Sequence, residues 1–326
     1  MFRYLVILVA TVVVLLTLAS LVYDVSWWYT KVLDFPRTQY LILALLCLPA
    51  FALLTRRWTW PAWLLTAGLV ATVLIQSLLV GPYLIGKKVV PDAPEAQVTE
   101  ANSVGILLAN VLITNREADR FLELVRERDP DMLLVMEVDN WWMERLEPLA
   151  DRYPHTMRFP AENAYGMALY SRFPLADRQT KFFNQEDVPS FHTRVTLPGG
   201  GEFMFHGMHP VAPVPSNKYP DNQGEKEVAF QKLAELLAGE SLPVIVAGDY
   251  NDVSWSRTAR LFESRGQLGN VRLGRGLYNT FDAGSWVMRW PLDHYFVSPD
   301  FSVVSLERLP AFGSDHFPMY ARFVLR

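Results

Sequence analysis

Three long apolar runs occupy the start of the chain, and they constrain its fold more than any other sequence feature. Residues 4–22 are almost uninterrupted apolar sequence, residues 40–54 form a shorter run, and residues 62–80 contain only Gln76 as a strongly polar residue. A helix rises about 1.5 Å per residue, so about twenty apolar residues cross the hydrocarbon core of a bilayer. We therefore predict an anchor of three transmembrane helices in residues 1–80, with the lipid bilayer as a partner.

The basic residues near these runs predict the side of the membrane on which the rest of the chain lies. Arg3 precedes the first run, and Arg56 and Arg57 lie in the short loop between the second and third. Basic residues gather in cytoplasmic loops, so three spans would place the remaining chain on the extracytoplasmic side of the cytoplasmic (inner) membrane. Four basic residues oppose this bias and make it modest: Lys31, Arg37, Lys87 and Lys88.

A cleaved signal peptide is the alternative interpretation of the first run. Leu18-Ala19-Ser20 has the small residues of a cleavage region. Two further apolar runs follow closely, however, and they favour a multi-pass anchor.

The remainder of the chain has a different composition. Residues 81–102 contain proline, glycine and charge without a sustained period, which predicts a linker to a soluble domain of residues 103–326. Residues 91–326 hold 23 basic and 32 acidic residues, a formal charge of −9. Grooves for duplex nucleic acid usually carry a positive field, so nucleic acid is a possible but not a favoured partner. The single cysteine, Cys47, lies in the second run, which excludes disulfides and cysteine metal sites from the soluble part.

The soluble part alternates short apolar runs with amphipathic stretches. This pattern predicts an α/β domain in which two sheets pack together beneath outer helices. The predicted strands are residues 104–109, 132–138, 167–170, 193–197, 202–207, 244–247, 295–298, 301–306 and 319–324, and the predicted helices are residues 116–128, 225–237 and 257–264.

Polar residues follow or precede several of these strands, at the edges to which a sheet delivers side chains. They are Asn110, Glu137, Asp249, Asn251, Asp293, His294, Asp315 and His316, and His209 follows another strand. Each one alone is more often a helix cap, a turn former or a strand end than a functional residue. Their accumulation in one domain is harder to explain in this way. We therefore predict that most of them share a site.

The residue types suit the hydrolysis of a phosphoester. A hard cation such as Mg²⁺ or Mn²⁺ prefers the oxygen ligands that Asn, Asp and Glu supply. The reaction needs an activated water, stabilisation of negative charge and help for the leaving oxygen, and carboxylates with histidines can provide these. The soluble part has neither a cysteine nor a Gly-x-Ser-x-Gly turn, which argues against thiol or serine nucleophiles.

Taken in order, these segments resemble the endonuclease/exonuclease/phosphatase family, in a membrane-anchored, bacterial-type form. The resemblance covers about residues 105–325. Its most specific elements are Gly248-Asp249-Tyr250-Asn251 and Ser314-Asp315-His316. The other matching segments are the strand end at Asn110, Asp129-Pro130-Asp131 with Met136-Glu137, the segment of residues 165–171, His209-Pro210, and the segment of residues 292–298.

The resemblance implies a four-layer αββα sandwich of two mixed sheets, and a role for each matching residue. Glu137, with Asn110 and Asp315, would hold Mg²⁺ or Mn²⁺. Asp249 would orient or deprotonate the attacking water. Asn251 would contact the phosphate, His209 and His316 would stabilise negative charge, and Asp293 would orient His316. His294 departs from the family pattern and is more simply a spectator on its strand.

The sequence therefore predicts a membrane-anchored, metal-dependent phosphoester hydrolase, specifically a phosphodiesterase for a small or lipid-borne phosphoester. A membrane-tethered nuclease for extracytoplasmic nucleic acid is one alternative. A non-catalytic membrane scaffold that keeps the fold is another. A different metallophosphoesterase fold would need more histidine and aspartate ligands in fixed motifs than the six histidines of this chain offer.

Overall fold

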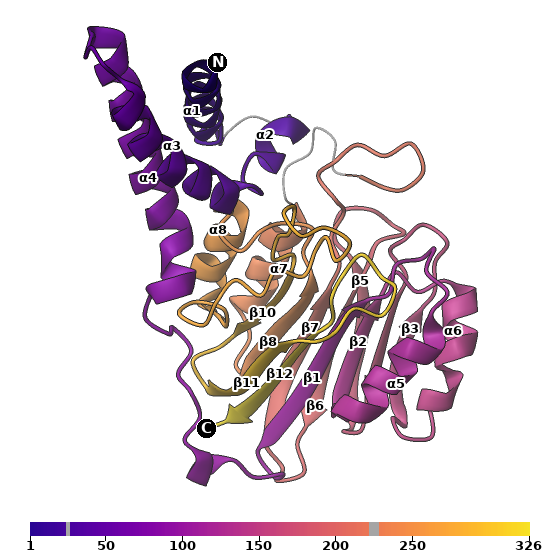
Figure 1. Ribbon diagram of the computed structural model, residues 1–326. Helices are drawn as coiled ribbons and strands as arrows, with labels where there is room; N and C mark the ends of the chain where they lie inside the picture. Colours follow the sequence, from indigo (N-terminus) through magenta and orange to yellow (C-terminus); the bar gives the residue numbers. More distant parts are fainter. Residues whose placement is uncertain (24–26, 222–227) are drawn as a thin grey trace.

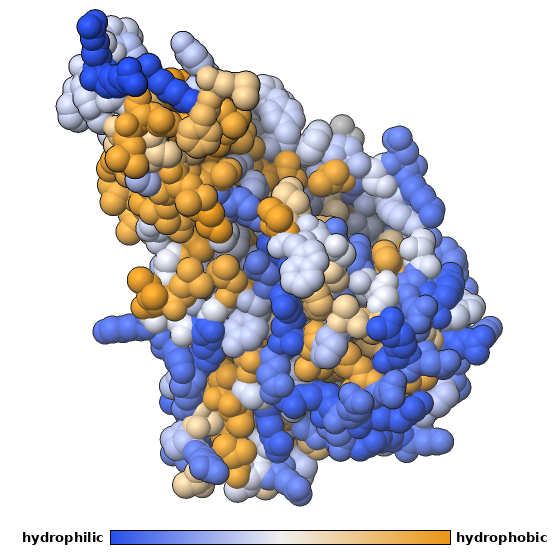
Figure 2. Space-filling model, in the orientation of Figure 1, coloured by the Kyte–Doolittle hydropathy of each residue, from blue (hydrophilic) through white to orange (hydrophobic). Residues whose placement is uncertain are grey.

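The three apolar runs form three long helices, as predicted. α1 spans Phe2–Ala19, α3 spans Arg37–Leu54 and α4 spans Trp60–Ile85, and each is long and apolar enough to cross a membrane. The helices pack together around buried side chains such as Ala10 of α1 and Leu69 of α4, so α1 is an integral part of the bundle. Figure 2 shows hydrophobic residues gathered over this bundle.

The computed structural model describes residues 1–23, 27–221 and 228–326. The predicted helix of residues 225–237 is therefore described as α7, Val228–Leu237, while residues 225–227 lie outside the described residues. Two short elements beside the anchor helices were not expected. These are α2, Trp28–Val32, between the first two apolar helices, and the 3₁₀ helix Glu95–Gln97 after α4.

Two six-stranded mixed sheets form the centre of the soluble part (Figure 1). The first sheet contains, in spatial order, β11 (Phe301–Arg308), β12 (Met319–Leu325), β1 (Ser103–Asn110), β2 (Met132–Met136), β4 (Met167–Ser171) and β3 (His155–Phe159). The second contains β5 (Leu175–Phe182), β6 (Pro189–Thr196), β7 (Glu202–Met208), β8 (Val244–Asp249), β10 (Asp293–Val297) and β9 (Gly269–Asn270).

Helices cover the outer face of each sheet. α5 (Ala118–Arg128) and α6 (Asn140–Leu146) pack on the first sheet. α7 and α8 (Arg257–Gly266) pack on the second. The largest apolar core lies between the two sheets, where residues such as Leu134 and Phe205 are fully buried. This arrangement confirms the predicted αββα sandwich.

The sheet topology brings several strand ends to one edge of the sandwich. β1 and β2 are parallel and pair Asn110 with Met136, so both strands end at the same place. In the second sheet β10 runs antiparallel to β8 and pairs Asp293 with Asp249. The strand predicted for residues 132–138 stops at Met136, because the next residue, Glu137, adopts a left-handed backbone conformation with φ of 62°.

The anchor packs directly on this edge of the sandwich. The indole Nε1 of Trp255 donates to the carbonyl oxygen of Asp34 at 2.7 Å, and the Tyr83 hydroxyl donates to the carbonyl oxygen of Ser254 at 2.6 Å. Trp255 and Tyr83 are both buried in an apolar cluster at this junction. The last turns of α4 therefore belong to the contact with the soluble domain.

Candidate active site

Asn110 and Glu137 begin the site at the ends of the paired strands β1 and β2. The Asn110 amide Nδ2 donates to Oε1 of Glu137 at 2.9 Å, and the Ile113 backbone amide donates to Oε2 of Glu137 at 3.0 Å. The left-handed backbone at Glu137 turns the chain immediately after the buried strand. Asn110 is buried and Glu137 is mostly buried. Both oxygens of the carboxylate are thus held in place.

Asp249 joins the second sheet to this pair. The amide Nδ2 of Asn110 also donates to Oδ2 of Asp249, at 3.0 Å, so one amide bridges carboxylates from both sheets. Gly248 makes the approach possible, because a Cβ atom there would lie 1.8 Å from the Met208 carbonyl oxygen and its φ is 150°. Asp249 is fully buried, and its Oδ1 accepts from the Asn251 amide at 2.9 Å.

Asp293 and His316 form a hydrogen-bonded pair beside Asp249. Nδ1 of His316 lies 2.8 Å from Oδ2 of Asp293, and Nε2 of His316 lies 3.5 Å from Oδ2 of Asp249. Asp293 is the first residue of β10, and the Thr280 hydroxyl accepts from its backbone amide at 3.3 Å. The imidazole of His316 is therefore enclosed by two carboxylates.

The charges of these groups depart from their ordinary values. Burial alone would lower the pKa of His316, but the Asp249 and Asp293 carboxylates outweigh it and raise this pKa to about 10. His316 is accordingly a cation at neutral pH. Burial raises the pKa of Glu137 to about 7, against the opposing hydrogen bonds to its carboxylate, and burial also raises the pKa of Asp315.

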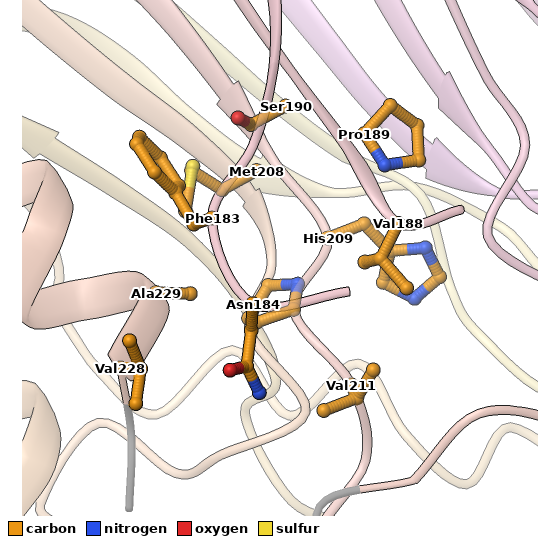
Figure 3. Close-up of a pocket in the computed structure, with 11 residues that line it drawn as sticks. Phe183, Asn184, Val188, Pro189, Ser190, Met208, His209, Val211, Val228 and Ala229 are labelled. Carbon is orange, nitrogen blue, oxygen red and sulfur yellow. The ribbon is translucent and has the colours of Figure 1, made fainter. Parts of the chain in front are cut away.

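His209 approaches Asp249 from the end of β7 and is neutral. Its Nε2 lies 3.8 Å from Oδ2 of Asp249, and burial lowers its pKa to about 4. The Tyr165 ring lies against the imidazole with centroids 4.9 Å apart. Among the described residues, Nδ1 of His209 has no hydrogen-bond partner. Figure 3 shows His209 at the wall of a small pocket that apolar residues such as Phe183 and Val211 line.

Asn251 and Asp315 complete the set of predicted residues. Asn251 has a left-handed backbone with φ of 50°, and its amide Nδ2 donates to the Pro210 carbonyl oxygen at 3.0 Å. Asp315 follows Ser314, whose hydroxyl donates to the carbonyl oxygen of Asn110 at 2.8 Å. This bond ties the loop before β12 to the end of β1.

The structure thus gathers the predicted site residues at one edge of the sandwich, and it leaves His294 out. His294 points to the opposite side of β10 from Asp293. Its Nε2 lies 2.9 Å from the Asp252 carbonyl oxygen and its Nδ1 lies 3.1 Å from the Arg272 guanidinium. It supports the loop after Asp249 from behind, in agreement with the expected spectator position.

The sequence predicted no role for three residues that contact the site. Tyr165 packs on His209, Thr280 accepts from the backbone of Asp293, and the Phe281 ring lies 5.0 Å from that of His316. Tyr165 stood within a segment that resembled the family, which was its only signal. Thr280 and Phe281 lie in a loop without periodic pattern, so the sequence contained no signal for them.

Asp249, Asp293 and His316 also form a compact buried group that could hold a cation. One ligand atom from each lies within 4.8 Å of those of the other two. Glu137 and Asp315 offer carboxylate oxygens beside this group. Asn110 turns its amide Nδ2 towards Glu137 and Asp249, and its Oδ1 accepts from the Leu112 amide at 3.0 Å. The fold and this concentration of buried acids, amide and imidazole define a phosphoesterase-type centre on an αββα sandwich.

The chain belongs to the endonuclease/exonuclease/phosphatase family, whose model matches residues 107–316, well over half of its length. Solved structures of the same fold include the human Nocturnin catalytic domain with bound sulfate anion. That match has 20% identity and a TM-score of 0.55, and it covers 69% of this chain and 95% of that chain. A comparison with curated proteins found no significant match.

Two further structures show the same fold. D. rerio TDP2 complexed with single strand DNA product has 17% identity and a TM-score of 0.54, over 68% of this chain and 98% of that chain. The Bacteroides thetaiotaomicron VPI-5482 mannosyl-6-phosphatase has 20% identity and a TM-score of 0.51, over 68% of this chain and 100% of that chain. The different substances in these descriptions leave the substrate of this chain open.

Proposed function

We propose that the chain is a membrane-anchored, divalent-metal-dependent phosphoester hydrolase, and specifically a phosphodiesterase for a small or lipid-borne phosphoester. One observation carries the proposal. Buried carboxylates from both sheets, a bridging amide and a charged imidazole converge on Asp249 at a single edge of the sandwich. Burying so many ionisable groups costs stability, and such groups cluster at functional sites.

Glu137, Asn110 and Asp315 are the residues that we propose hold Mg²⁺ or Mn²⁺. The two carboxylates fit a hard cation, because they supply oxygen ligands and because a cation would offset the burial that disfavours their ionised forms. The Asn110 Nδ2 donates to the carboxylates of both Glu137 and Asp249, so Asn110 would ligate a cation through Oδ1 only after its amide turns. When bound there, the cation would supply positive charge for the phosphoryl oxygens.

The neighbouring group of Asp249, Asp293 and His316 suits a different task. An imidazole that binds a cation must be neutral, whereas the two carboxylates keep His316 protonated. We therefore propose that His316 donates to the phosphoryl oxygens and that Asp293 orients it. Asp249, close to both histidines, would orient or deprotonate the attacking water.

The two remaining residues would bind the phosphate. His209 is neutral, so it would offer an N–H donor rather than a charge to the developing negative oxygen. Asn251, whose backbone amide is fixed by Asp249, would present its side chain to the phosphate. In this arrangement donors and acceptors are preorganised around the reacting phosphorus, which is the usual source of catalysis in such centres.

The proposed enzyme faces the extracytoplasmic side of the cytoplasmic membrane. The N-terminus and the loop between α3 and α4 lie at the end of the helices away from the sandwich (Figure 1). In the sequence, Arg3 is close to the N-terminus, and Arg56 and Arg57 belong to that loop. On the sandwich side, Arg37 pairs with Asp34. The proposed division is an anchor of residues 1–80, a linker of residues 81–102 and a catalytic domain of residues 103–326. A reporter fused after residue 95 tests this topology, and a cytoplasmic reporter signal would contradict it.

A direct test uses the full chain solubilised in detergent. We expect hydrolysis of bis(p-nitrophenyl) phosphate that requires Mg²⁺ or Mn²⁺ and stops with EDTA. Asp249→Asn should lower the rate by roughly 10²–10⁴-fold, the range for loss of a general base. The matched control is Asp300→Asn, an exposed carboxylate outside the site. Absence of metal-dependent hydrolysis would leave a non-catalytic scaffold, and full activity of Asp249→Asn would overturn the proposed site.

The substrate class is tested with a panel of phosphoesters. DNA, RNA, phospholipids, sphingomyelin, inositol phosphates and the monoester p-nitrophenyl phosphate should be compared under the same Mg²⁺ conditions. A preference for nucleic acid would replace the lipid-borne substrate with the nuclease alternative. The metal position is tested in the same assay, since Glu137→Gln should weaken metal activation and Asp293→Asn should preserve the metal requirement.

A further inference from the structure

A loop beside the site presents an apolar tip to its surroundings. Trp286, Val287 and Met288 are 89%, 69% and 49% exposed, although folded domains rarely expose neighbouring large apolar side chains without a use for them. The loop is well built. The Met288 amide donates to the Ser285 hydroxyl at 2.8 Å, and the Arg289 guanidinium lies over the Trp286 ring.

Both ends of this loop contact the site residues. The Phe281 ring lies against that of His316, and the Ala283 amide donates to the carbonyl oxygen of Asp315 at 2.7 Å. The other end is bridged back to Phe281 by Trp290. The position of the tip and the position of the site are thus fixed relative to each other.

The tip also contacts the anchor. The amide Nε2 of Gln39, in the first turn of α3, donates to the Val287 carbonyl oxygen at 2.7 Å. Exposed Ile42 and Leu46 follow on the same helix, three and seven residues later, and therefore on the same face. The apolar tip is continuous with a stripe of α3 that an anchor helix would turn towards lipid.

A buried polar network at the same end of the bundle indicates how deep in the membrane this contact lies. Arg37 pairs with Asp34 and donates to the carbonyl oxygen of Ser20 at 3.0 Å and to Gln76 at 3.2 Å. Charged groups in membrane helices are paired and lie near the interface when they can. Gln39 lies only two residues further along α3, so it and the loop tip lie close to the boundary between headgroups and hydrocarbon.

The length of α4 gives the same boundary independently. Its 26 residues would span about 39 Å at helical rise, while the hydrocarbon core is about 30 Å thick. The excess emerges at the soluble domain, where Val80 and Tyr83 are buried against protein. Aromatic residues of the kind that favour the interface, Trp27 and Tyr29, are exposed at this end of the bundle.

We propose that Trp286, Val287 and Met288 enter the interfacial region of the same bilayer that α1, α3 and α4 span. The loop would then hold the site over the headgroups, and the substrate would be a phosphoester in the headgroup of a lipid in that leaflet. The second part rests on the proposed function, while the position of the loop does not. A membrane is favoured over a protein partner because the tip adjoins the lipid-facing stripe of α3.

The position of the loop is tested with a single labelled cysteine. Cys47→Ser removes the native thiol, and Met288→Cys then carries an environment-sensitive fluorophore in vesicles of phosphatidylcholine and phosphatidylglycerol. The control is Glu100→Cys, an exposed position just before the start of β1, at the opposite end of that strand from Asn110. We expect lipids with nitroxide on the acyl chain to quench the label at position 288 and not at position 100. Equal quenching at both positions would overturn the proposal.

The substrate class is tested by activity. Trp286→Ser should lower hydrolysis of a vesicle-borne lipid phosphodiester roughly tenfold, the scale of losing burial of one large apolar side chain, and leave bis(p-nitrophenyl) phosphate hydrolysis unchanged. The matched control is Val304→Ser, a partly exposed apolar residue on β11. Equal losses on both substrates would overturn the lipid assignment. If the wild-type chain hydrolyses neither substrate while the label at position 288 is quenched, the proposed function is overturned and the position of the loop in the membrane stands.

Discussion

Replacement of Glu137 by glutamine should remove a loss of stability that the metal-free protein undergoes as pH rises. The pKa of Glu137 is about 7 in the folded protein, against 4.5 for an ordinary glutamate, chiefly because of burial. One pKa unit corresponds to about 1.4 kcal/mol, so above pH 7 the ionised carboxylate costs the folded state about 3 kcal/mol. Glutamine avoids this cost because it carries no charge. Its NH₂ group faces an N–H donor, that of Ile113 or of Asn110, where the carboxylate had an acceptor, and this second cost is the same at every pH.

The sign of the pH dependence follows from the order of the two pKa values. Because the folded pKa is the higher one, the unfolded chain loses its proton first, and the wild-type protein loses stability as pH rises from about 4.5 to about 7. Glu137→Gln cannot ionise and lacks this decline. The stability of the variant relative to the wild type should therefore rise by about 3 kcal/mol between pH 4 and pH 8.

The assay is thermal unfolding of the detergent-solubilised chain with EDTA. For a domain of this size 1 kcal/mol shifts Tm by roughly 2–4 °C, so the Tm of the variant relative to the wild type should rise by roughly 6–12 °C between pH 4 and pH 8. Adding Mg²⁺ should raise the Tm of the wild type alone, since a ligand of the folded state stabilises it. The same Tm difference at pH 4 and pH 8 would refute the assignment of a high pKa to Glu137.

Three other expectations use different readouts. Asp293→Asn removes one of the carboxylates that keep His316 protonated, so the alkaline loss of activity, expected near pH 10 in the wild type, should move to lower pH. Protonated His316 adds its full stability below its ordinary pKa of 6.5, and this stability is lost as pH rises through about 10. Denaturant unfolding of the wild type should therefore show lower stability at pH 10 than at pH 7. In Asp293→Asn this decline should be smaller. Trp255→Ala should cost about 3–5 kcal/mol in denaturant unfolding, because the indole is buried and hydrogen-bonded to the anchor.

The central strands were predictable from sequence because they are apolar throughout. All eight residues of β1 and all five of β2 are buried, so their composition alone indicates a strand between two layers. β5 was not predicted, since only its first residue, Leu175, is buried and the others face solvent or are partly covered. Such an edge strand is defined by its pairing with β6, which no local pattern records.

The site was predictable as a set of residues, and its electrostatics were not. The parallel pairing of β1 and β2 explains why Asn110 and Glu137 meet, and strand ends with polar residues are visible in sequence. The bridging of Glu137 and Asp249 by one amide depends on the spacing of the two sheets. The charge of His316 depends on two carboxylates that approach it in space, so only the folded structure reveals it.

The junction between anchor and sandwich has a consequence for how substrate reaches the site. Ser254 and Trp255 follow Asp249 within a few residues, and both bind the anchor. The Ser254 carbonyl oxygen accepts from the Tyr83 hydroxyl, and the Trp255 indole donates to the Asp34 carbonyl oxygen. Because those contacts are buried, the loop that carries Asp249 is held directly by the helices rather than by a free tether. A site on a flexible tether can reach substrates at many heights above a bilayer. A site held this way works at one height, which favours a substrate whose own phosphate is fixed at the membrane surface.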